Sequence, residues 1–193
     1  TCLAQLLTNR GRVISPTYLD KLLVQKSSAY IQALSENGKL PLYPGLEDFL
    51  YRIKAASLPL GLVTGNSKAE VDWVLAQANL TQQFAITVTG ADVSAYEDKP
   101  ATKLYERAIA GLQEQIPGLQ LAPQECLAVE ASFAGITAAK QAGVAVVGVA
   151  HLYPYRMMQR QANWAVDYLN EIDLDWIQPQ YSPNLFAVNE AIG

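Results

Sequence analysis

From about residue 41 onward, short and largely apolar runs alternate with stretches whose apolar residues recur every three or four positions. The apolar runs are 60–63, 84–88, 126–129 and 145–149. Runs without polar alternation are typical of strands buried on both faces, and the three-and-four spacing is typical of amphipathic helices. The pattern therefore predicts a doubly wound α/β domain, in which helices cover both faces of a parallel sheet.

Residues 1–36 have a helical pattern instead. Ser15-Pro16 is a helix start signal, with Ser15 as N-cap and Pro16 at the first helical position. Asn37-Gly38 marks the end of this helix, and Pro44-Gly45 lies in the linker that follows. We therefore expect two units, a small helical one over residues 1–40 and an α/β core over residues 41–193.

Helix boundaries within the core can also be predicted. Ser67 is expected to cap one helix, with Glu70 three residues later completing a capping box. A helix is predicted from Pro100 to Leu112. Another is expected to begin after Ser132 and to end at Gly143. These boundaries place a helix start directly after several of the predicted strands.

Composition excludes several classes of protein. Half of the 193 residues are hydrophobic, so a large core can be buried and disorder of the whole chain is excluded. The net charge of −4 and the scattered 14 basic residues argue against nucleic acid as a partner. No apolar run approaches the length needed to span a membrane. Two cysteines 124 positions apart favour a reducing compartment, and we expect a cytoplasmic protein.

Chemistry is expected where strands end, because ligands of doubly wound sheets bind beyond the carboxyl ends of the strands. Thr64-Gly65-Asn66-Ser67 combines a hydroxyl, a flexible glycine and a helix start, which suits a phosphate, although an ordinary strand-to-helix turn has the same residues. Lys99 precedes a helix start, where a cation opposes the macrodipole; it either holds a phosphate or is a solvated lysine. Glu130 either ligates Mg²⁺ or caps the next helix.

Four blocks in this order carry a resemblance to a known family. They are Pro44-Gly45-Leu46, Leu62-Val63-Thr64-Gly65-Asn66, Asp98-Lys99-Pro100-Ala101 and the run from Cys126 to Gly143 that contains Glu130-Ala131-Ser132-Phe133. The chain resembles the haloacid dehalogenase-like superfamily, in its β-phosphoglucomutase and phosphoglycolate-phosphatase-like branch, over about residues 12–177. The resemblance implies a Rossmann-like core with a helical cap, which is partial here, and a phosphoryl-transfer enzyme acting on a small phosphorylated metabolite.

The resemblance also implies roles for single residues. Thr64, with Gly65 and Asn66, matches the motif whose hydroxyl binds the transferring phosphoryl group. Lys99 matches the lysine that neutralises charge on that group. Glu130 matches the first of the acids that supply Mg²⁺ with oxygen ligands. Phosphoryl transfer needs little beyond such positioning and charge stabilisation.

Two departures from the family pattern are visible. The family's first motif, Asp-x-Asp after an apolar strand, has no counterpart before Pro44; Asp173-Leu174-Asp175 lies where the family has a C-terminal helix and is not interpreted as that motif. Ala131 stands where the family usually has a second acid, and Phe133 replaces a common proline. Mg²⁺ is therefore expected to bind weakly or not at all.

The missing motif belongs to a strand that lies at the centre of the family's sheet, between the strands ending at Thr64 and Glu130. A segment ahead of residue 1 is the simplest source of this strand, and a partner chain or residues 185–188 are less favoured sources. The sequence therefore supports two functions: a Mg²⁺-dependent phosphatase or phosphomutase whose nucleophile lies outside residues 1–193, and a catalytically inactive relative that serves as a binding or scaffold protein. Residues 1–193 alone are expected to be inactive.

Overall fold

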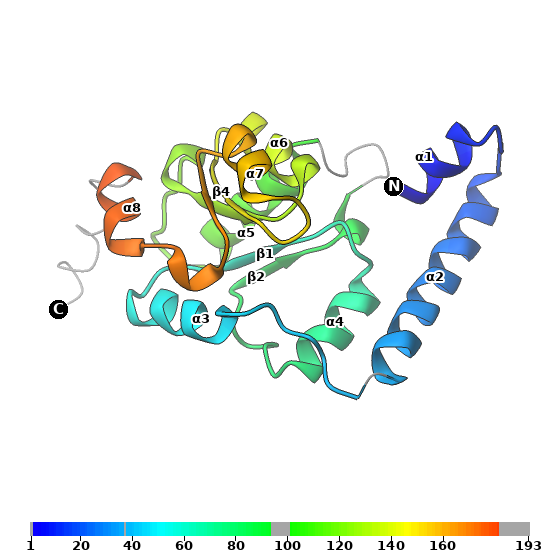
Figure 1. The fold of residues 1–193 in the computed structure, drawn as a ribbon, viewed down its shortest axis with the longest axis horizontal. Coiled ribbons are helices and arrows are strands. Elements are labelled where there is room, and N and C mark those ends of the chain that lie inside the picture. The colour runs from blue at the N-terminus through cyan, green and yellow to red at the C-terminus, as the bar shows by residue number, and fades with distance from the viewer. Residues whose placement is uncertain (1, 37, 94–100, 182–193) are drawn as a thin grey trace.

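A computed structural model describes residues 2–36, 38–93 and 101–181 of the protein (Figure 1). The helices are α1 (Cys2–Asn9), α2 (Pro16–Glu36), α3 (Leu46–Ala55), α4 (Lys68–Gln77), α5 (Lys103–Gln115), α6 (Phe133–Gln141), α7 (Tyr155–Gln161) and α8 (Leu174–Tyr181). The strands are β1 (Gly61–Val63), β2 (Ile86–Val88), β3 (Leu127–Glu130), β4 (Ala145–Val149) and β5 (Trp164–Val166). Short 3₁₀ turns are η1 (Gly90–Asp92), η2 (Pro123–Glu125) and η3 (Leu169–Glu171).

The predicted alternation of strands and helices is confirmed, with boundaries shifted by a few residues. Every strand pair is parallel, as expected for strands joined through helices. The helix predicted from Pro100 is described from Lys103 to Gln115, because Thr102 occupies its N-cap position. The strand predicted over 84–88 is shorter and begins at Ile86. The fold is the Rossmann-like α/β arrangement predicted from the sequence.

The strands form two separate sheets. β1 pairs with β2, and β3, β4 and β5 pair in that order. No pairing joins β1 to β3 among the described residues. A groove of about 460 Å³ lies between the two sheets, lined by residues 60–63 on one wall and 126–130 on the other.

Strand β4 is the centre of the larger sheet, and all five of its residues are buried. Its side chains alternate between the two helical layers. Val146 packs with Ile136 of α6 and Met158 of α7 on one face, whereas Val147 packs with Phe49 of α3 on the other. This three-layer packing explains why the sequence of β4 is apolar throughout rather than alternating.

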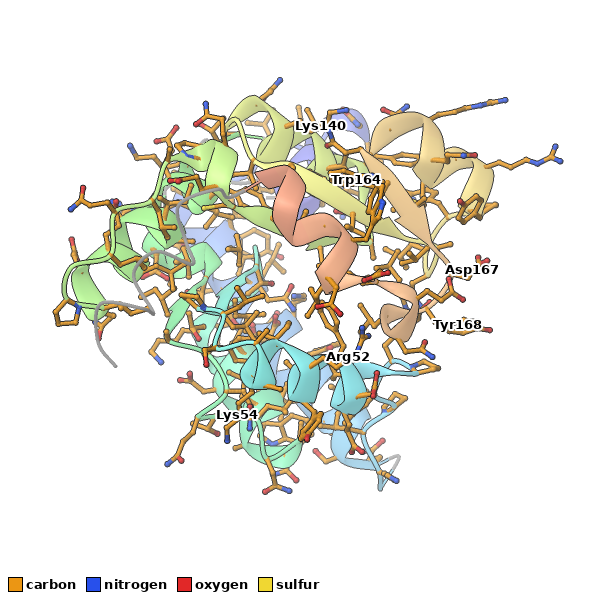
Figure 2. All side chains as sticks on the ribbon, turned by 90° about the vertical axis from the view of Figure 1, so that its left-hand side faces the viewer. Arg52, Lys54, Lys140, Trp164, Asp167 and Tyr168 are labelled. Carbon is orange, nitrogen blue, oxygen red and sulfur yellow. The ribbon has the colours of Figure 1, made fainter. Side chains whose placement is uncertain are left out.

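The polypeptide after β5 returns across the α3 face. Figure 2 shows Arg52 of α3 pointing toward this segment, and its guanidinium donates hydrogen bonds to the carbonyl oxygens of Ile172 at 2.7 Å and Leu169 at 3.4 Å. Ile172 and Ile177 are buried against α3 and the sheet. Backbone carbonyls at a turn are therefore satisfied by a side chain, which fixes how η3 and α8 cover this face.

Helix α2 lies beside α4 (Figure 1) and is joined to it by polar contacts. Lys26 Nζ donates to both carboxylate oxygens of Glu70, at 2.8 and 3.1 Å, and the Ser27 and Ser67 hydroxyls are 3.0 Å apart. Ser67 caps α4 as predicted by accepting a hydrogen bond from the Glu70 N–H. The Glu70 carboxylate contacts Lys26 of α2, and a backbone hydrogen bond from Ser67 also lowers its pKa, as the predicted capping box implies.

Candidate functional site

The loop after β1 begins with a hydrogen bond that extends the strand pair, from the Thr64 N–H to the carbonyl oxygen of Val88 at 2.9 Å. The Thr64 hydroxyl then accepts a hydrogen bond from the Asn66 N–H at 3.1 Å. Ser67 ends the loop as the N-cap of α4. The half-buried Thr64 hydroxyl therefore lies in the loop that leads into the first turn of α4. A hydroxyl next to a helix N-terminus is an arrangement suited to binding an anion.

A second turn supports this loop from the end of β2. The Asn66 carbonyl accepts a hydrogen bond from the Gly90 N–H at 2.9 Å, and a Cβ at Gly90 would lie 2.4 Å from the carbonyl oxygen of Gly65. Only glycine permits so close an approach of two backbones. The loop after β1 is thus held in place by the turn after β2.

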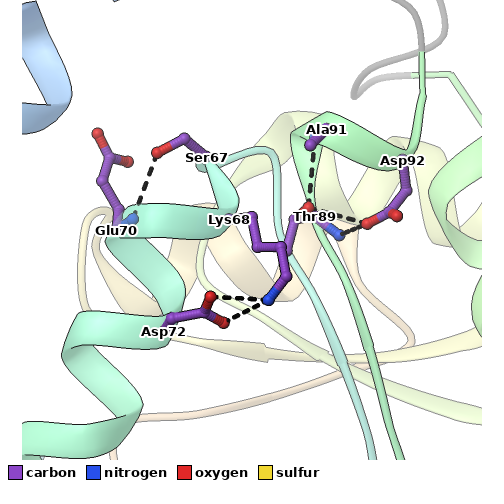
Figure 3. A network of polar contacts seen from close by, with 7 residues as sticks. All are labelled: Ser67, Lys68, Glu70, Asp72, Thr89, Ala91 and Asp92. Atoms are coloured by element: carbon purple, nitrogen blue, oxygen red, sulfur yellow. Dashed lines mark hydrogen bonds and ion pairs between the residues drawn. The ribbon is translucent and has the colours of Figure 1, made fainter. Parts of the chain in front are cut away.

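Asp92 closes that second turn, as Figure 3 shows. Its carboxylate oxygen Oδ2 accepts hydrogen bonds from the Thr89 N–H at 2.7 Å and from the Thr89 hydroxyl at 2.8 Å. The N–H hydrogen bond is the main reason why the pKa of Asp92 is lowered, and the charges of Arg107 and Lys68 act in the same direction. Asp92 is therefore an ionised structural anchor of the turn, which the sequence analysis did not single out.

These observations bear on the predicted phosphate pocket. Thr64 lies in the loop that leads into α4. The Asn66 N–H, which the prediction assigned to an anion, donates to Thr64 in this structure. Lys99, the fourth member of the predicted pocket, lies outside the described residues. The convergence of all four groups remains a prediction.

Glu130 ends β3 and turns its carboxylate inward. The Tyr105 hydroxyl donates to Oε1 at 2.5 Å and the Ser132 hydroxyl donates to Oε2 at 3.4 Å. Ser132 in turn accepts a hydrogen bond from the Gly135 N–H at 3.0 Å and caps α6, as predicted. Burial and then the charge and hydrogen bond of Glu130 raise the pKa of Tyr105, which therefore stays protonated and remains a donor.

Gly135 explains why the carboxylate fits there. A Cβ at this position would lie 2.0 Å from Glu130 Oε2 and 2.1 Å from Glu130 Cδ. The carboxylate thus rests against the backbone of the first turn of α6, where the helix dipole favours negative charge. The sequence held a signal for this contact, since a glycine within a helical stretch costs stability and calls for a packing reason. Tyr105 gave no comparable signal, because an aromatic residue at helical spacing is ordinary core.

The described residues do not form a magnesium site by themselves. No group of three or more His, Cys, Asp or Glu side chains that could hold a metal ion occurs within the part of the chain that the structure describes. Ala131 offers no side-chain oxygen, and both oxygens of Glu130 already accept hydrogen bonds. Glu130 fits a structural or supporting position better than that of a principal metal ligand.

Asp173 and Asp175, the Asp-x-Asp pair of the sequence, belong to α8. Asp173 Oδ1 accepts a hydrogen bond from the Trp176 N–H at 3.0 Å, which is the geometry of a helix N-cap. Both side chains are exposed. The interpretation of this pair as the start of a C-terminal helix, and not as a nucleophile motif, agrees with the structure.

The two strand ends face the same groove from opposite sides, since Val63 and Glu130 both line it. Cys126 also lines it, and burial, together with the charge of Glu125, raises the pKa of its thiol to about 11. This thiol is therefore neutral and contributes to an apolar lining. The groove separates the loop at Thr64 from the loop at Glu130.

Comparison with known proteins identifies the family. Residues 7–143 match the haloacid dehalogenase-like hydrolases. The chain belongs to this family. It is 32% identical over 143 residues to protein CbbY of Rhodobacter capsulatus. The aligned region covers 72% of this chain and 58% of that protein. It is 30% identical over 135 residues to the phosphoglycolate phosphatase of Escherichia coli K12, covering 70% of this chain and 50% of that protein.

Solved structures agree on the fold. A β-phosphoglucomutase from Clostridium difficile superposes with a TM-score of 0.74 at 23% identity, covering 97% of this chain and 77% of that one. A hydrolase from Pseudomonas syringae gives a TM-score of 0.76 at 19% identity, covering 93% and 77%. The chain spans about half the length of the relatives matched by sequence, 58% of CbbY and 50% of the phosphoglycolate phosphatase. No helix in the described ranges is long and apolar enough to cross a membrane.

Proposed function

We propose that the protein is a phosphatase-type hydrolase that acts on a small phosphorylated metabolite through an aspartyl-phosphate intermediate, with its nucleophile outside residues 1–193. Membership of the haloacid dehalogenase-like family supports a hydrolase. The observation that carries the proposal further is the placement of the Thr64 and Glu130 loops at the carboxyl ends of β1 and β3, which border one groove. The E. coli relative is a phosphoglycolate phosphatase, and a CbbY structure holds xylulose 1,5-bisphosphate.

In this proposal the loop after β1 holds the transferring phosphoryl group. The Thr64 hydroxyl accepts from Asn66 and so keeps its own proton to donate to a phosphoryl oxygen. Gly65 offers its backbone N–H just ahead of α4, where the helix dipole adds positive potential, and the Asn66 N–H acts indirectly by orienting the Thr64 hydroxyl. Lys99 is assigned to neutralise charge on the phosphoryl group.

The attacking carboxylate comes from outside residues 1–193 in this proposal. Its oxygen attacks phosphorus, the ester oxygen leaves with a proton from a second acid, and water then hydrolyses the acyl phosphate to release inorganic phosphate. Support comes from the gap between β1 and β3, where a strand supplied by a partner or by a segment ahead of residue 1 would end beside Thr64 and Glu130. Haloacid dehalogenase-like phosphatases generally use Mg²⁺, but the described residues form no site for it, and no step is assigned to it here.

A fusion tests the proposal. An apolar strand that ends in Asp-x-Asp is joined ahead of residue 1 by a flexible linker, and phosphate release from phosphoglycolate and xylulose 1,5-bisphosphate is measured. We expect no release by residues 1–193 alone, release by the fusion, and none when the first aspartate of the added motif is replaced by asparagine. Ala131→Asp in the fusion should lower the Mg²⁺ concentration that gives half-maximal activity, because it restores an oxygen ligand.

The competing function is that of a catalytically inactive relative which binds or scaffolds. Ala131 and the inward-turned carboxylate of Glu130 favour it, since neither provides a metal ligand in the described structure. Phosphate binding without turnover, in a fusion that also carries Ala131→Asp, would support this alternative and contradict the phosphatase. Turnover by residues 1–193 alone would contradict both and would make Asp173 and Asp175 the first residues to substitute.

A further inference from the structure

A second pocket lies where the end of α2 and the linker after it meet α4 (Figure 1). It has a volume of about 260 Å³ and borders the second half of α4, away from Ser67 at the start of that helix. The side chains used below come from α2, the linker and α4, and they are Leu34, Ser35, Lys39, Leu40, Trp73 and Gln77. An apolar cavity of about 150 Å³ is large enough to bind benzene. This α2–α4 pocket therefore has room for a bicyclic ring.

The apolar part of the lining favours a flat ring. Leu34 and Leu40 supply aliphatic surface, and Trp73 is half-buried. Within the part of the chain that the structure describes, the Trp73 ring makes no contact with another aromatic ring or with a cation. A ligand ring placed against this indole would gain both apolar burial and the favourable geometry of an aromatic pair.

The charge of the pocket is positive. Lys39 is the only charged side chain among the described residues that line it, and it forms no ion pair within the described ranges. The two acids nearest to the lining in sequence are engaged outside it. Glu36 accepts a hydrogen bond from the Gln32 amide at 2.9 Å, and Asp72 pairs with Lys68 at 2.7 Å. An anionic group is therefore the charge that suits this pocket.

A second donor is available for such an anion. The Gln77 side-chain amide makes no hydrogen bond to any described residue, and an amide NH₂ offers two donors. The Ser35 hydroxyl does not compete with it, because it donates to the carbonyl oxygen of Ile31 at 2.6 Å. A mostly apolar cavity with a few unengaged polar groups is the usual composition of a small-molecule site.

We infer that the α2–α4 pocket binds a small aromatic carboxylate. Its ring lies against Trp73 and the two leucines, and its carboxylate is held by Lys39 and Gln77. The site is separate from the proposed function, since it uses neither the Thr64 loop nor a residue from outside the chain. Because the walls come from both α2 and α4, an occupant links these helices a second time, in addition to the ion pair between Lys26 and Glu70.

The experiment titrates residues 1–193 with 2-naphthoate at low salt, followed by isothermal titration calorimetry. Acetate has the carboxylate without the ring, and 2-naphthylmethanol has the ring without the charge. We expect 2-naphthoate to bind, acetate to give no measurable binding, and the alcohol to bind about fivefold more weakly, which is the effect of one exposed charge pair. Equal affinities for the acid and the alcohol, or no binding of 2-naphthoate, would overturn the inference.

Two matched pairs of variants locate the ligand. Lys39→Met should weaken binding of 2-naphthoate about fivefold and leave the alcohol unchanged, whereas Lys54→Met, at an exposed lysine of α3 outside the lining (Figure 2), should change neither. Trp73→Leu should weaken binding of both ligands about tenfold. Trp176→Leu removes a 51% exposed indole of α8 and should have no effect. Lys39 is exposed, so its variant tests the site even where Trp73→Leu does not fold.

Hydrogen–deuterium exchange distinguishes this pocket from the larger groove between the sheets, which is the other apolar place for a ring. We expect 2-naphthoate to slow exchange of amides in residues 33–40 and 73–78, because the ligand links the two helices. Protection confined to residues 60–63 and 126–130, with binding unchanged in both Lys39→Met and Trp73→Leu, would place the ligand in the groove and overturn the inference.

Discussion

Strands β3 and β4 lie side by side in one sheet and have similar sequences, yet their environments differ. β4 pairs on both edges and is buried throughout, with Val147 only 1% exposed. Within the described residues β3 pairs only with β4, and Val129 of β3, whose paired residue is Val147, remains 37% exposed. The difference shows that burial in this fold is set by whether a strand has two neighbours and not by its apolar content. The apolar residues of β3 that line the groove are therefore less well buried than those of β4.

The largest expected effect is the difference in the free energy of unfolding between Val147→Asp and Val129→Asp. In Val147→Asp a charge enters a closed core, at a cost of several kcal/mol, which is comparable to the 5–15 kcal/mol that keeps a typical domain folded. In Val129→Asp the carboxylate can stay hydrated in the groove, and we expect a loss of about 1 kcal/mol. Urea unfolding followed by circular dichroism measures both. Similar losses in the free energy of unfolding for the two variants would mean that Val129 is as well buried in solution as Val147.

Gly135→Ala tests the fit of Glu130 at the end of β3. The new methyl group would overlap the Glu130 carboxylate, so we expect a loss of about 1–3 kcal/mol in the free energy of unfolding. Helix propensity alone would make Gly135→Ala stabilising by up to about 1 kcal/mol. A destabilising effect would therefore indicate that the new methyl group overlaps Glu130. Adding Glu130→Ala should recover most of the loss. Additive effects in the double variant would argue against the contact.

The polar contact between α2 and α4 should give a smaller, pH-dependent effect. Burial raises the pKa of Glu70, but the hydrogen bonds from Lys26 and Ser27 and the charge of Lys26 outweigh it and hold this pKa below 4.5. A carboxyl whose pKa is lowered by folding stabilises the native state above its unfolded pKa. That contribution is lost as the pH falls below 4.5 through the folded value.

We therefore expect Glu70→Gln to cost about 1–2 kcal/mol at neutral pH, reduced from the value for a fully buried pair because Lys26 is 52% exposed. The difference from the unsubstituted chain should shrink as the pH is lowered, which unfolding measured at several pH values would show. Asp72→Asn is the matched control, because its ion pair with Lys68 at 2.7 Å is exposed and should matter by less than about 0.5 kcal/mol. A pH-independent effect of Glu70→Gln would contradict the assignment.

The local signals in the sequence were sufficient for much of the fold. Ser67 and Ser132 predict the helix starts that the structure shows, and the apolar run 145–149 predicts the buried strand β4. Contacts between distant residues could not be predicted. Lys26 and Glu70 are 44 positions apart, and a capping box is the simplest local interpretation of a glutamate at that position, so its tertiary partner was missed.

The candidate site shows the same division. Thr64 and Glu130 could be proposed because each follows a buried strand, where position alone predicts a ligand-binding edge. The orientation of the Glu130 carboxylate could not, since it depends on Tyr105 from another helix and on the missing side chain of Gly135. A sequence pattern thus predicts which residues reach the edge of the sheet, whereas packing decides where their polar atoms point.

The smallest expected effect concerns Asp173, whose carboxylate caps α8 through the Trp176 N–H at 3.0 Å. Asp173→Ala should lower the free energy of unfolding by about 0.5–1 kcal/mol, the usual value of an N-cap, because Ile177 of the same helix packs in the core. Asp175→Asn, at an exposed site in the first turn, should change stability by at most a few tenths of a kcal/mol through the helix dipole. Phosphate release by the strand-bearing fusion should be the same for both variants as for the parent. A loss of turnover in either variant, with stability unchanged, would assign this pair a chemical role and contradict its interpretation as the start of a helix.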